Sequence, residues 1–288
     1  MAGAPEMNLT PSDHDRNASG MTYVYPVVSR RARGVSVGIN LNPNSACNWR
    51  CLYCQVPDLQ RGSAPPIDVE LLAGELDTLL TQVTSSDWME SNVPEGSRRL
   101  NDIAFSGNGE PTTSRELPEV ITAAHQVMES HGLLDGIDVV LITNGSLIDR
   151  DWVSEGLRRL ASHRGEVWFK LDRADAAGRA LLNDTPIPDE KVLGNLVRSS
   201  ELCKTRLQTM VVGVDGEGPD EQAIEAWIGL VRAAMGRGAA IHDVLLYGLA
   251  RESYQPEAPR LSRLPVSELE RLASRITAEL GLPASAHP

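Results

Sequence analysis

The stretch VSVGINLNPNSACNWRCLYC, residues 35–54, begins as a β-strand and ends in three closely spaced cysteines. Its first part, Val35–Leu41, is apolar and β-branched, which predicts a buried strand. Cys47, Cys51 and Cys54 follow that strand at spacings of four and three residues. Thiolates so spaced can converge on one face of an iron–sulfur cubane and leave one iron without a protein ligand. The stretch therefore predicts a strand that is followed by a metal-binding loop.

Cysteine usage favours a metal site over disulfides. The chain has four cysteines in all, and the fourth, Cys203, stands alone. A disulfide framework needs cysteines spread along the chain, so this layout indicates a metal site in a reducing compartment. Structural zinc prefers four nitrogen or sulfur ligands, and the cysteine loop contains no histidine. We expect Cys203 to be a small buried apolar residue, although it is the one cysteine that could serve as a fourth ligand.

Short apolar runs alternate with longer amphipathic stretches over most of the chain. The runs that predict strands are Val35–Leu41, Asp102–Ser106, Ile137–Thr143, Val167–Leu171, Leu207–Gly213 and Asp243–Leu249. The stretches that predict helices are Asp68–Val83, Arg115–His131, Asp151–His163, Glu190–Leu202, Asp220–Met235 and Val266–Leu280. This alternation predicts an α/β fold, a partial (β/α)6 TIM-like barrel of parallel strands with outer helices. In such folds ligands gather at the carboxyl ends of the strands.

Composition also predicts how the chain is divided. Residues 1–20 are polar and predict a mobile tail, residues 21–265 the barrel domain, and residues 266–288 a C-terminal helix and tail. Pro94 and Gly96 break the helical pattern, so we expect Thr84–Leu100 to be an exposed connection. The stretch Ala250–Pro265 contains three prolines, and we expect it to be an extended loop. It is long enough to fold over the open mouth of the barrel.

The charge balance and the hydropathy pattern restrict the partners. The 288 residues carry 27 Lys and Arg against 39 Asp and Glu, a net charge of −12, which disfavours a nucleic-acid backbone as a partner unless basic residues cluster. No run of 18 or more apolar residues occurs, and the first 20 residues lack the pattern of a secretory signal. We expect a soluble, cytoplasmic protein without a membrane partner.

Two turns follow predicted strands and offer polar groups at the ligand-binding edge. After the second strand the chain reads Gly107-Asn108-Gly109-Glu110-Pro111, where the glycines allow backbone carbonyls to approach a ligand closely. After the third strand Thr143-Asn144 offers hydrogen bonds into the same pocket. Either turn alone is common in proteins that only reverse the chain there.

The fourth and fifth strands place further polar side chains on one face. Alternation puts Lys170 and Asp172 on the same side of the fourth strand, and Gln208 is a candidate pocket residue on the fifth. A lysine in a buried parallel strand is costly to desolvate unless it is paired or used. Lys170 is therefore a candidate catalytic residue, which could bind an anionic group or form a Schiff base if burial lowers its pKa. An ion pair with Asp172 that serves only the fold is the alternative.

The three cysteines, with Tyr53 in the position before the last one, match the CxxxCxΦC pattern and resemble the radical S-adenosylmethionine (SAM) superfamily. The resemblance covers about residues 34–265. It implies a single [4Fe–4S] cluster and SAM as cofactors, with Tyr53 near the adenine. It also implies that residues 107–111 bind the SAM amino group, as the similar GGEP segment does. The implied reaction is reductive cleavage of SAM to a 5′-deoxyadenosyl radical.

Within the superfamily, the GxGEPT and KLD segments resemble the branch of wyosine-type tRNA-modification enzymes. Those enzymes typically carry extra N-terminal cysteines, and residues 1–46 contain none. The substrate thus stays open between a small molecule, a tRNA base and a protein. A glycyl-radical-activating enzyme is an alternative within the superfamily, and an iron–sulfur electron carrier or redox sensor is one outside it. A radical SAM enzyme would need a reductant such as flavodoxin or ferredoxin.

Overall fold

A curved eight-stranded sheet forms the centre of the protein. The computed structural model describes residues 7, 9–10, 16, 19–29 and 34–288. The strand order is β1-β2-β5-β6-β7-β8-β10-β12, and every neighbouring pair is parallel except β1 and β2. The strands are β1 (Val24–Ser29), β2 (Gly34–Ile39), β5 (Leu100–Phe105), β6 (Asp138–Thr143), β7 (Gly165–Lys170), β8 (Lys204–Met210), β10 (Ile241–Tyr247) and β12 (Ala284–His287).

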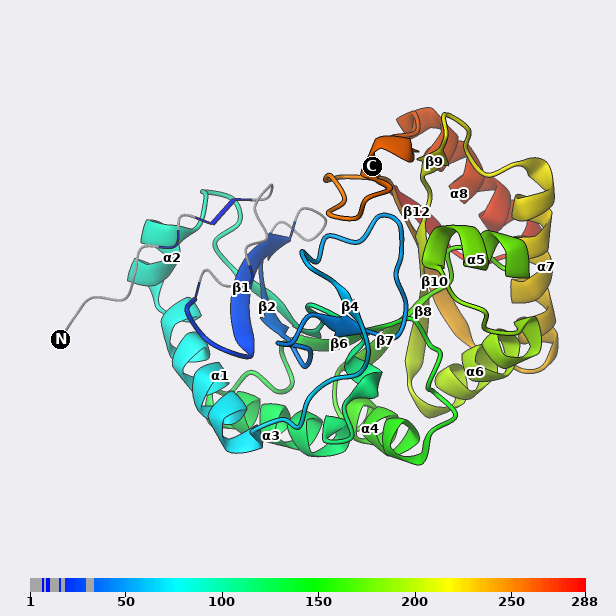
Figure 1. Ribbon diagram of the computed structural model, residues 1–288. Helices are drawn as coiled ribbons and strands as arrows, with labels where there is room; N and C mark the ends of the chain where they lie inside the picture. Colours follow the sequence, from blue (N-terminus) through cyan, green and yellow to red (C-terminus); the bar gives the residue numbers. More distant parts are fainter. Residues whose placement is uncertain (1–6, 8, 11–15, 17–18, 30–33) are drawn as a thin grey trace.

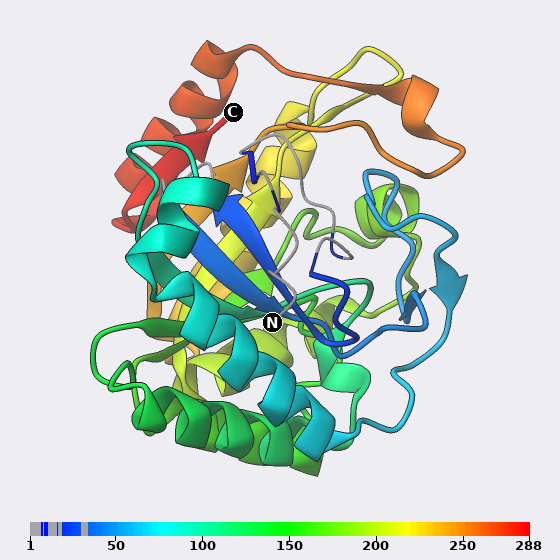
Figure 2. The ribbon, with the colours of Figure 1, turned by 90° about the vertical axis from the view of Figure 1, so that its left-hand side faces the viewer.

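Helices cover the outer face of this sheet, apart from the short α5 (Ala176–Asn183), which lies at one end of the sheet beside the cysteine loop (Figure 2). Figure 1 shows them following its curve from α1 round to α8. They are α1 (Val69–Val83), α2 (Ser86–Asn92), α3 (Leu117–Ser130), α4 (Asp151–Ala161), α5 (Ala176–Asn183), α6 (Asp189–Leu202), α7 (Glu221–Gly236) and α8 (Val266–Leu280). In α1 the leucines 72, 76, 79 and 80 are fully buried, which is the stripe that their spacing predicts. Among the described residues, no helix is both long and apolar enough to cross a membrane.

The predicted α/β partial barrel is confirmed, with all six predicted strands in the sheet and all six predicted helices outside it. The two edge strands, β1 and β12, were not predicted. Residues 284–287, expected in a tail, pair with β10 instead. Most of residues 1–20 lie outside the described residues, so the predicted mobile tail stays a prediction, although Met7 and Leu9 are buried against the domain.

The predicted exposed connection Thr84–Leu100 is wrong in part. It contains α2, whose Trp88 and Met89 are buried, and Val93 at the end of that helix is buried too. Pro94 and Gly96 follow the helix and do not interrupt it. The short helix is stable in this place because its apolar side chains join the main core.

The inner face of the barrel has an apolar middle and a polar lower end. Trp168 packs there with Ala104, Val140 and Leu245. Below them, at the amino ends of the strands, the buried Glu166 accepts hydrogen bonds from Trp168 Nε1 at 2.7 Å and Arg206 Nη1 at 3.2 Å.

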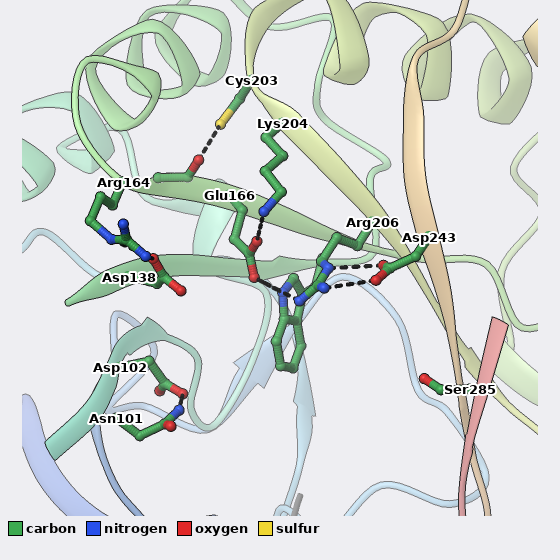
Figure 3. A network of polar contacts seen from close by, with 12 residues as sticks. Asn101, Asp102, Asp138, Arg164, Glu166, Cys203, Lys204, Arg206, Asp243 and Ser285 are labelled. Atoms are coloured by element: carbon green, nitrogen blue, oxygen red, sulfur yellow. Dashed lines mark hydrogen bonds and ion pairs between the residues drawn. The ribbon is translucent and has the colours of Figure 1, made fainter. Parts of the chain in front are cut away.

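Two further ion pairs complete this lower network, which Figure 3 shows. Lys204 Nζ lies 3.0 Å from the Glu166 carboxylate, and Arg206 forms a two-pronged pair with Asp243 at 2.8 and 2.7 Å. Burial alone would raise the pKa of Glu166, but the Trp168 hydrogen bond and the two cations outweigh it and lower that pKa. In barrels of this kind the amino end serves stability, and the opposite end carries the chemistry.

We predict that Glu166→Ala lowers the free energy of unfolding by about 2 to 3 kcal/mol, because it leaves the Trp168 N–H and one face of Arg206 without their acceptor. Urea denaturation measures the loss.

The folded-state pKa of Glu166 is lowered. Its contribution to the free energy of unfolding is therefore fully present above the unfolded pKa of about 4.3 and is lost as the pH falls through the folded pKa. The control is Glu190→Ala, whose partner Arg237 lies at the surface, with an expected change within about 0.5 kcal/mol. Equal losses in the two variants would contradict the network's importance.

Candidate metal centre and its cavity

A cavity of about 420 Å³ opens at the carboxyl ends of the barrel strands, and all three clustered cysteines line it. Ten of the predicted site residues contribute to its wall: Cys47, Cys51, Tyr53, Cys54, Gly107, Gly109, Glu110, Asn144, Lys170 and Gln208. Segments far apart in the sequence therefore meet here, as the parallel topology predicts. The other predicted residues, Asn108, Pro111, Thr143 and Asp172, lie directly beside this wall.

Backbone hydrogen bonds hold the cysteine loop against α5. The amides of Arg50 and Leu52 donate to the carbonyls of Asn183 and Leu182, at 3.2 and 2.9 Å. Just before the loop, the short strand β3 (Ala46–Cys47) pairs with β4 (Gln60–Arg61). In the described part of the chain, no group of three or more His, Cys, Asp and Glu side chains is arranged to hold one metal ion. The three thiols line one cavity.

Burial keeps these thiols protonated in the metal-free protein. It raises the pKa of Cys47 to about 12 and that of Cys51 to about 11, and it raises the pKa of Cys54 as well. A nucleophilic cysteine needs the opposite shift, because the thiolate is the reactive form. Metal binding displaces such protons outright. The metal-free thiols therefore lack the lowered pKa of a nucleophilic cysteine.

Glu110 joins the two predicted turns into one wall of the cavity. Its buried carboxylate accepts hydrogen bonds from Thr112 and from the Thr143 hydroxyl at 2.7 Å, and from the amide of Asn144 at 2.7 Å. Burial nevertheless raises the pKa of Glu110. Pro111 starts the short 3-10 turn Pro111–Thr113 that shapes this wall. A carboxylate already anchored by several donors presents a fixed edge to the cavity.

Gly109 allows the wall and the cysteine loop to touch. A Cβ at this position would stand 2.0 Å from the carbonyl oxygen of Ala46, the residue before Cys47. The neighbouring Asn108 accepts a hydrogen bond through its side chain from Arg16, which lines the cavity, at 2.7 Å. The glycine predicted to admit a ligand thus also admits the backbone of the cysteine loop.

Lys170, Tyr53 and Asp172 form one hydrogen-bonded group. Lys170 Nζ donates to the Tyr53 hydroxyl at 2.8 Å and lies 3.9 Å from the Asp172 carboxylate, while the Tyr53 hydroxyl donates to Asp172. Burial would lower the pKa of Lys170, but nearby acidic groups, Asp172 foremost, outweigh it and raise that pKa. Lys170 is therefore a cation here. The lowered pKa that a Schiff-base lysine would need is not found.

Several site residues were missed in the sequence. Asn183, at the end of α5, donates a hydrogen bond to Cys51 Sγ at 3.3 Å, yet neither α5 nor this contact follows from a sequence pattern. Tyr25 of the unpredicted strand β1 lines the cavity, as does Arg16. For Gln208 the structure adds that its Oε1 is buried without a hydrogen-bond partner among the described residues.

The loop after the sixth strand contacts the cysteine loop, but it is not extended throughout as predicted, because it contains a 3-10 turn (Ala258–Arg260) and a short strand (Leu261–Ser262). Ser253–Glu257, which we call the strap, lies on the cysteine loop. The Ser253 hydroxyl donates to the Leu52 carbonyl at 2.6 Å, and Arg50 pairs with Glu257 through two hydrogen bonds of 2.9 and 2.6 Å. Figure 2 shows the cysteine loop in blue, α5 in green and the strap in orange at one end of the sheet.

Cys203 lies at the opposite end of the barrel from this site. It precedes β8, and its Sγ contacts the Gly165 carbonyl at 3.5 Å, beside the Glu166 network of Figure 3. Cys203 is buried, as predicted, and burial raises its pKa to about 12. It cannot reach the other three cysteines from there.

No protein-family model matches the chain. Curated relatives include a segment of the GTPase Obg of Brachyspira hyodysenteriae, with 31% identity over 43% of this chain and 15% of that protein. A UPF0026 protein of Synechocystis sp. has 26% identity over 52% of this chain, and one of Methanocaldococcus jannaschii has 27% over 67%. The matches span 48% and 55% of those two relatives, so the chain covers about half of their lengths.

Similar solved structures identify the fold. A radical SAM methyltransferase from Sphaerobacter thermophilus superposes with a TM-score of 0.62 and 15% identity, over 92% of this chain and 68% of that one. TYW1 with a lysine–pyruvate adduct bound gives a TM-score of 0.55 and 16% identity, over 95% and 80%. This protein has the partial-barrel fold of the radical SAM superfamily.

We predict that Gly109→Ala destabilises the protein by about 1 to 3 kcal/mol, because the new methyl group forces the wall of the cavity away from the Ala46 carbonyl. Thermal and urea denaturation measure the change. Gly74→Ala in the exposed interior of α1 is the matched control, since nothing lies within 4 Å of its Cβ position. That control should be neutral or stabilising by up to about 1 kcal/mol. A Gly109→Ala protein as stable as wild type would show that the two loops do not pack as described.

Proposed function

We propose that this chain is a radical SAM enzyme that holds one [4Fe–4S] cluster through Cys47, Cys51 and Cys54 and acts on a substrate still to be identified. When bound, the cluster and SAM would supply the reductive cleavage that yields a 5′-deoxyadenosyl radical for hydrogen abstraction. One observation carries the proposal. Three partly buried thiols line a single cavity at the carboxyl ends of a parallel partial barrel, and the fourth cysteine lies at the far end.

The donor set fits such a cluster. A cubane is ligated by thiolates, which the three thiols lining this cavity can supply, whereas structural zinc usually takes four nitrogen or sulfur ligands. Three thiols would leave one iron for an outside ligand. An electron carrier would usually use four cysteines, and the position of Cys203 disfavours that alternative. The glycyl-radical-activating alternative would share this cluster and differ in its substrate, a partner protein.

The chain's own residues would bind and orient SAM. The anchored carboxylate of Glu110 faces the cavity, and Gly107 and Gly109 bring backbone close to it, which suits an amino group. Tyr53, fixed by Asp172, would present its ring to the adenine. The strap and α5 would keep the cysteine loop in place around the cluster. We further propose flavodoxin or ferredoxin as the reductant.

Lys170 would act as a fixed cation for the carboxylate of SAM. The acidic groups around it hold its pKa high, which favours charge pairing over imine formation. TYW1 has been solved with a lysine–pyruvate adduct, so a covalent role for this lysine is the second candidate. A carboxylate bound by the ammonium would sit beside Tyr53 and above Trp168, inside the cavity.

We predict that each of Cys47→Ala, Cys51→Ala and Cys54→Ala abolishes the visible absorbance of the anaerobically reconstituted protein and the formation of 5′-deoxyadenosine. Each change removes one of three ligands. Iron analysis and mass spectrometry of the products after dithionite reduction measure both effects. Cys203→Ala is the control and should keep both. Zinc in the purified protein, or SAM cleavage by the triple variant, would contradict the assignment.

We predict that Lys170→Met weakens SAM binding by about 10- to 100-fold, since a charged hydrogen bond contributes about 1.5–3 kcal/mol. Lys170→Arg keeps the charge and should lose less. Calorimetry on the reconstituted variants measures the affinity. Unchanged affinity in Lys170→Met would remove this lysine from the SAM site. A borohydride-trapped adduct of pyruvate on Lys170 would favour the covalent role.

A further inference from the structure

We propose that Asn183 is a positioning residue that raises the reduction potential of the cluster through its hydrogen bond to Cys51 Sγ. This inference rests on the proposed function, because it requires a cluster on Cys51. Asn183 is almost fully buried, with 1% of its surface exposed, and its Nδ2 lies 3.3 Å from Cys51 Sγ. Hydrogen bonds to cluster sulfurs are one of the means by which a protein sets the potential.

The neighbouring Asp172 fixes which end of the amide faces the sulfur. Asn183 Nδ2 also lies 2.7 Å from Asp172 Oδ2, and an ionised carboxylate only accepts hydrogen bonds. The amide must therefore turn its nitrogen, and not its oxygen, toward Asp172. Its two N–H groups then serve Asp172 and Cys51. With the amide reversed, its oxygen would face both a carboxylate and a thiolate.

Asp172 is itself held rigidly, so the amide cannot easily turn away. Its side chain is completely buried, and its Oδ1 accepts the backbone amide of Met210 at 2.8 Å. Its Oδ2 accepts from Tyr53 as well as from Asn183. Asn183 is fixed on the backbone side too, because its carbonyl accepts the amide of Arg50 in the cysteine loop. The N–H that faces Cys51 is thus in place before any cluster binds.

The sign of the effect follows from charge. Reduction adds an electron to the cluster and makes its sulfurs better acceptors, so a fixed N–H stabilises the reduced form more than the oxidised one. Loss of the N–H should therefore make the cluster harder to reduce. A hydrogen bond of ordinary strength would change the reduction equilibrium by up to about tenfold, which corresponds to 59 mV for a one-electron couple.

The test is an EPR-monitored redox titration of the reconstituted protein without substrate. Asn183→Leu is nearly isosteric and removes both N–H groups. Asn183→Asp keeps the shape, but an ionised carboxylate donates no hydrogen bond and a protonated one donates a single bond, for which Asp172 competes. Asn92→Leu is the matched control: it makes the same substitution at a buried amide in α2, which donates to the Trp88 carbonyl and does not line the cavity.

We expect midpoints more negative than wild type in both Asn183 variants and a wild-type midpoint in Asn92→Leu, at equal iron and sulfide content. Wild-type midpoints in the Asn183 variants would overturn the inference. So would loss of the cluster in both of them while Asn92→Leu retains it, because the amide would then serve assembly and not the potential. A wild-type protein that binds no cluster would instead overturn the proposed function.

Discussion

The site depends on three thiols being held in fixed places by segments that are remote in sequence. A loop of eight residues with three cysteines has little structure of its own, and ordering it costs about 1–2 kcal/mol per residue. Here α5 binds its backbone on one side, the strap binds it on another, and the Gly109 wall lies against its start. Each of these segments follows a barrel strand. The curvature of the parallel sheet is thus what brings the thiols and their supports together.

The same barrel separates stability from chemistry along its axis. At the amino end, Glu166 is balanced by Lys204 and Arg206, and Arg206 in turn by Asp243, so buried charges are paired. Trp168 closes the middle with apolar surface. At the carboxyl end the acidic groups Glu110 and Asp172 share the site with three thiols and one lysine. Glu110 and Lys170 at the carboxyl end line an open cavity, whereas the charged groups at the amino end are paired with one another.

Much of this arrangement could be predicted from the sequence, because it follows from local patterns. The sequence shows the barrel strands β2, β5, β6, β7, β8 and β10 as apolar runs. It shows the cysteines by their spacing and Lys170 as a charge inside a buried strand. What could not be predicted depends on tertiary contacts. β12 carries the weakly apolar sequence Ala284–His287 and is a strand only because β10 offers it an edge. Asn183 ends a helix of eight residues that is ordered by the cysteine loop it supports.

Electrostatics explains why a lysine stands at the centre of this site. Asp172 and Glu110 act on Lys170, and each favours its charged form. Thiolates that ligate a cluster add negative charge to a region already holding two buried carboxylates, and a cation there lowers the cost. Lys170 also donates to Tyr53, which donates to Asp172, and Asp172 orients Asn183 toward Cys51. One chain of hydrogen bonds therefore connects the Lys170 ammonium with Cys51 Sγ. A change in the charge of Lys170 should thus also change the hydrogen bond that Cys51 accepts.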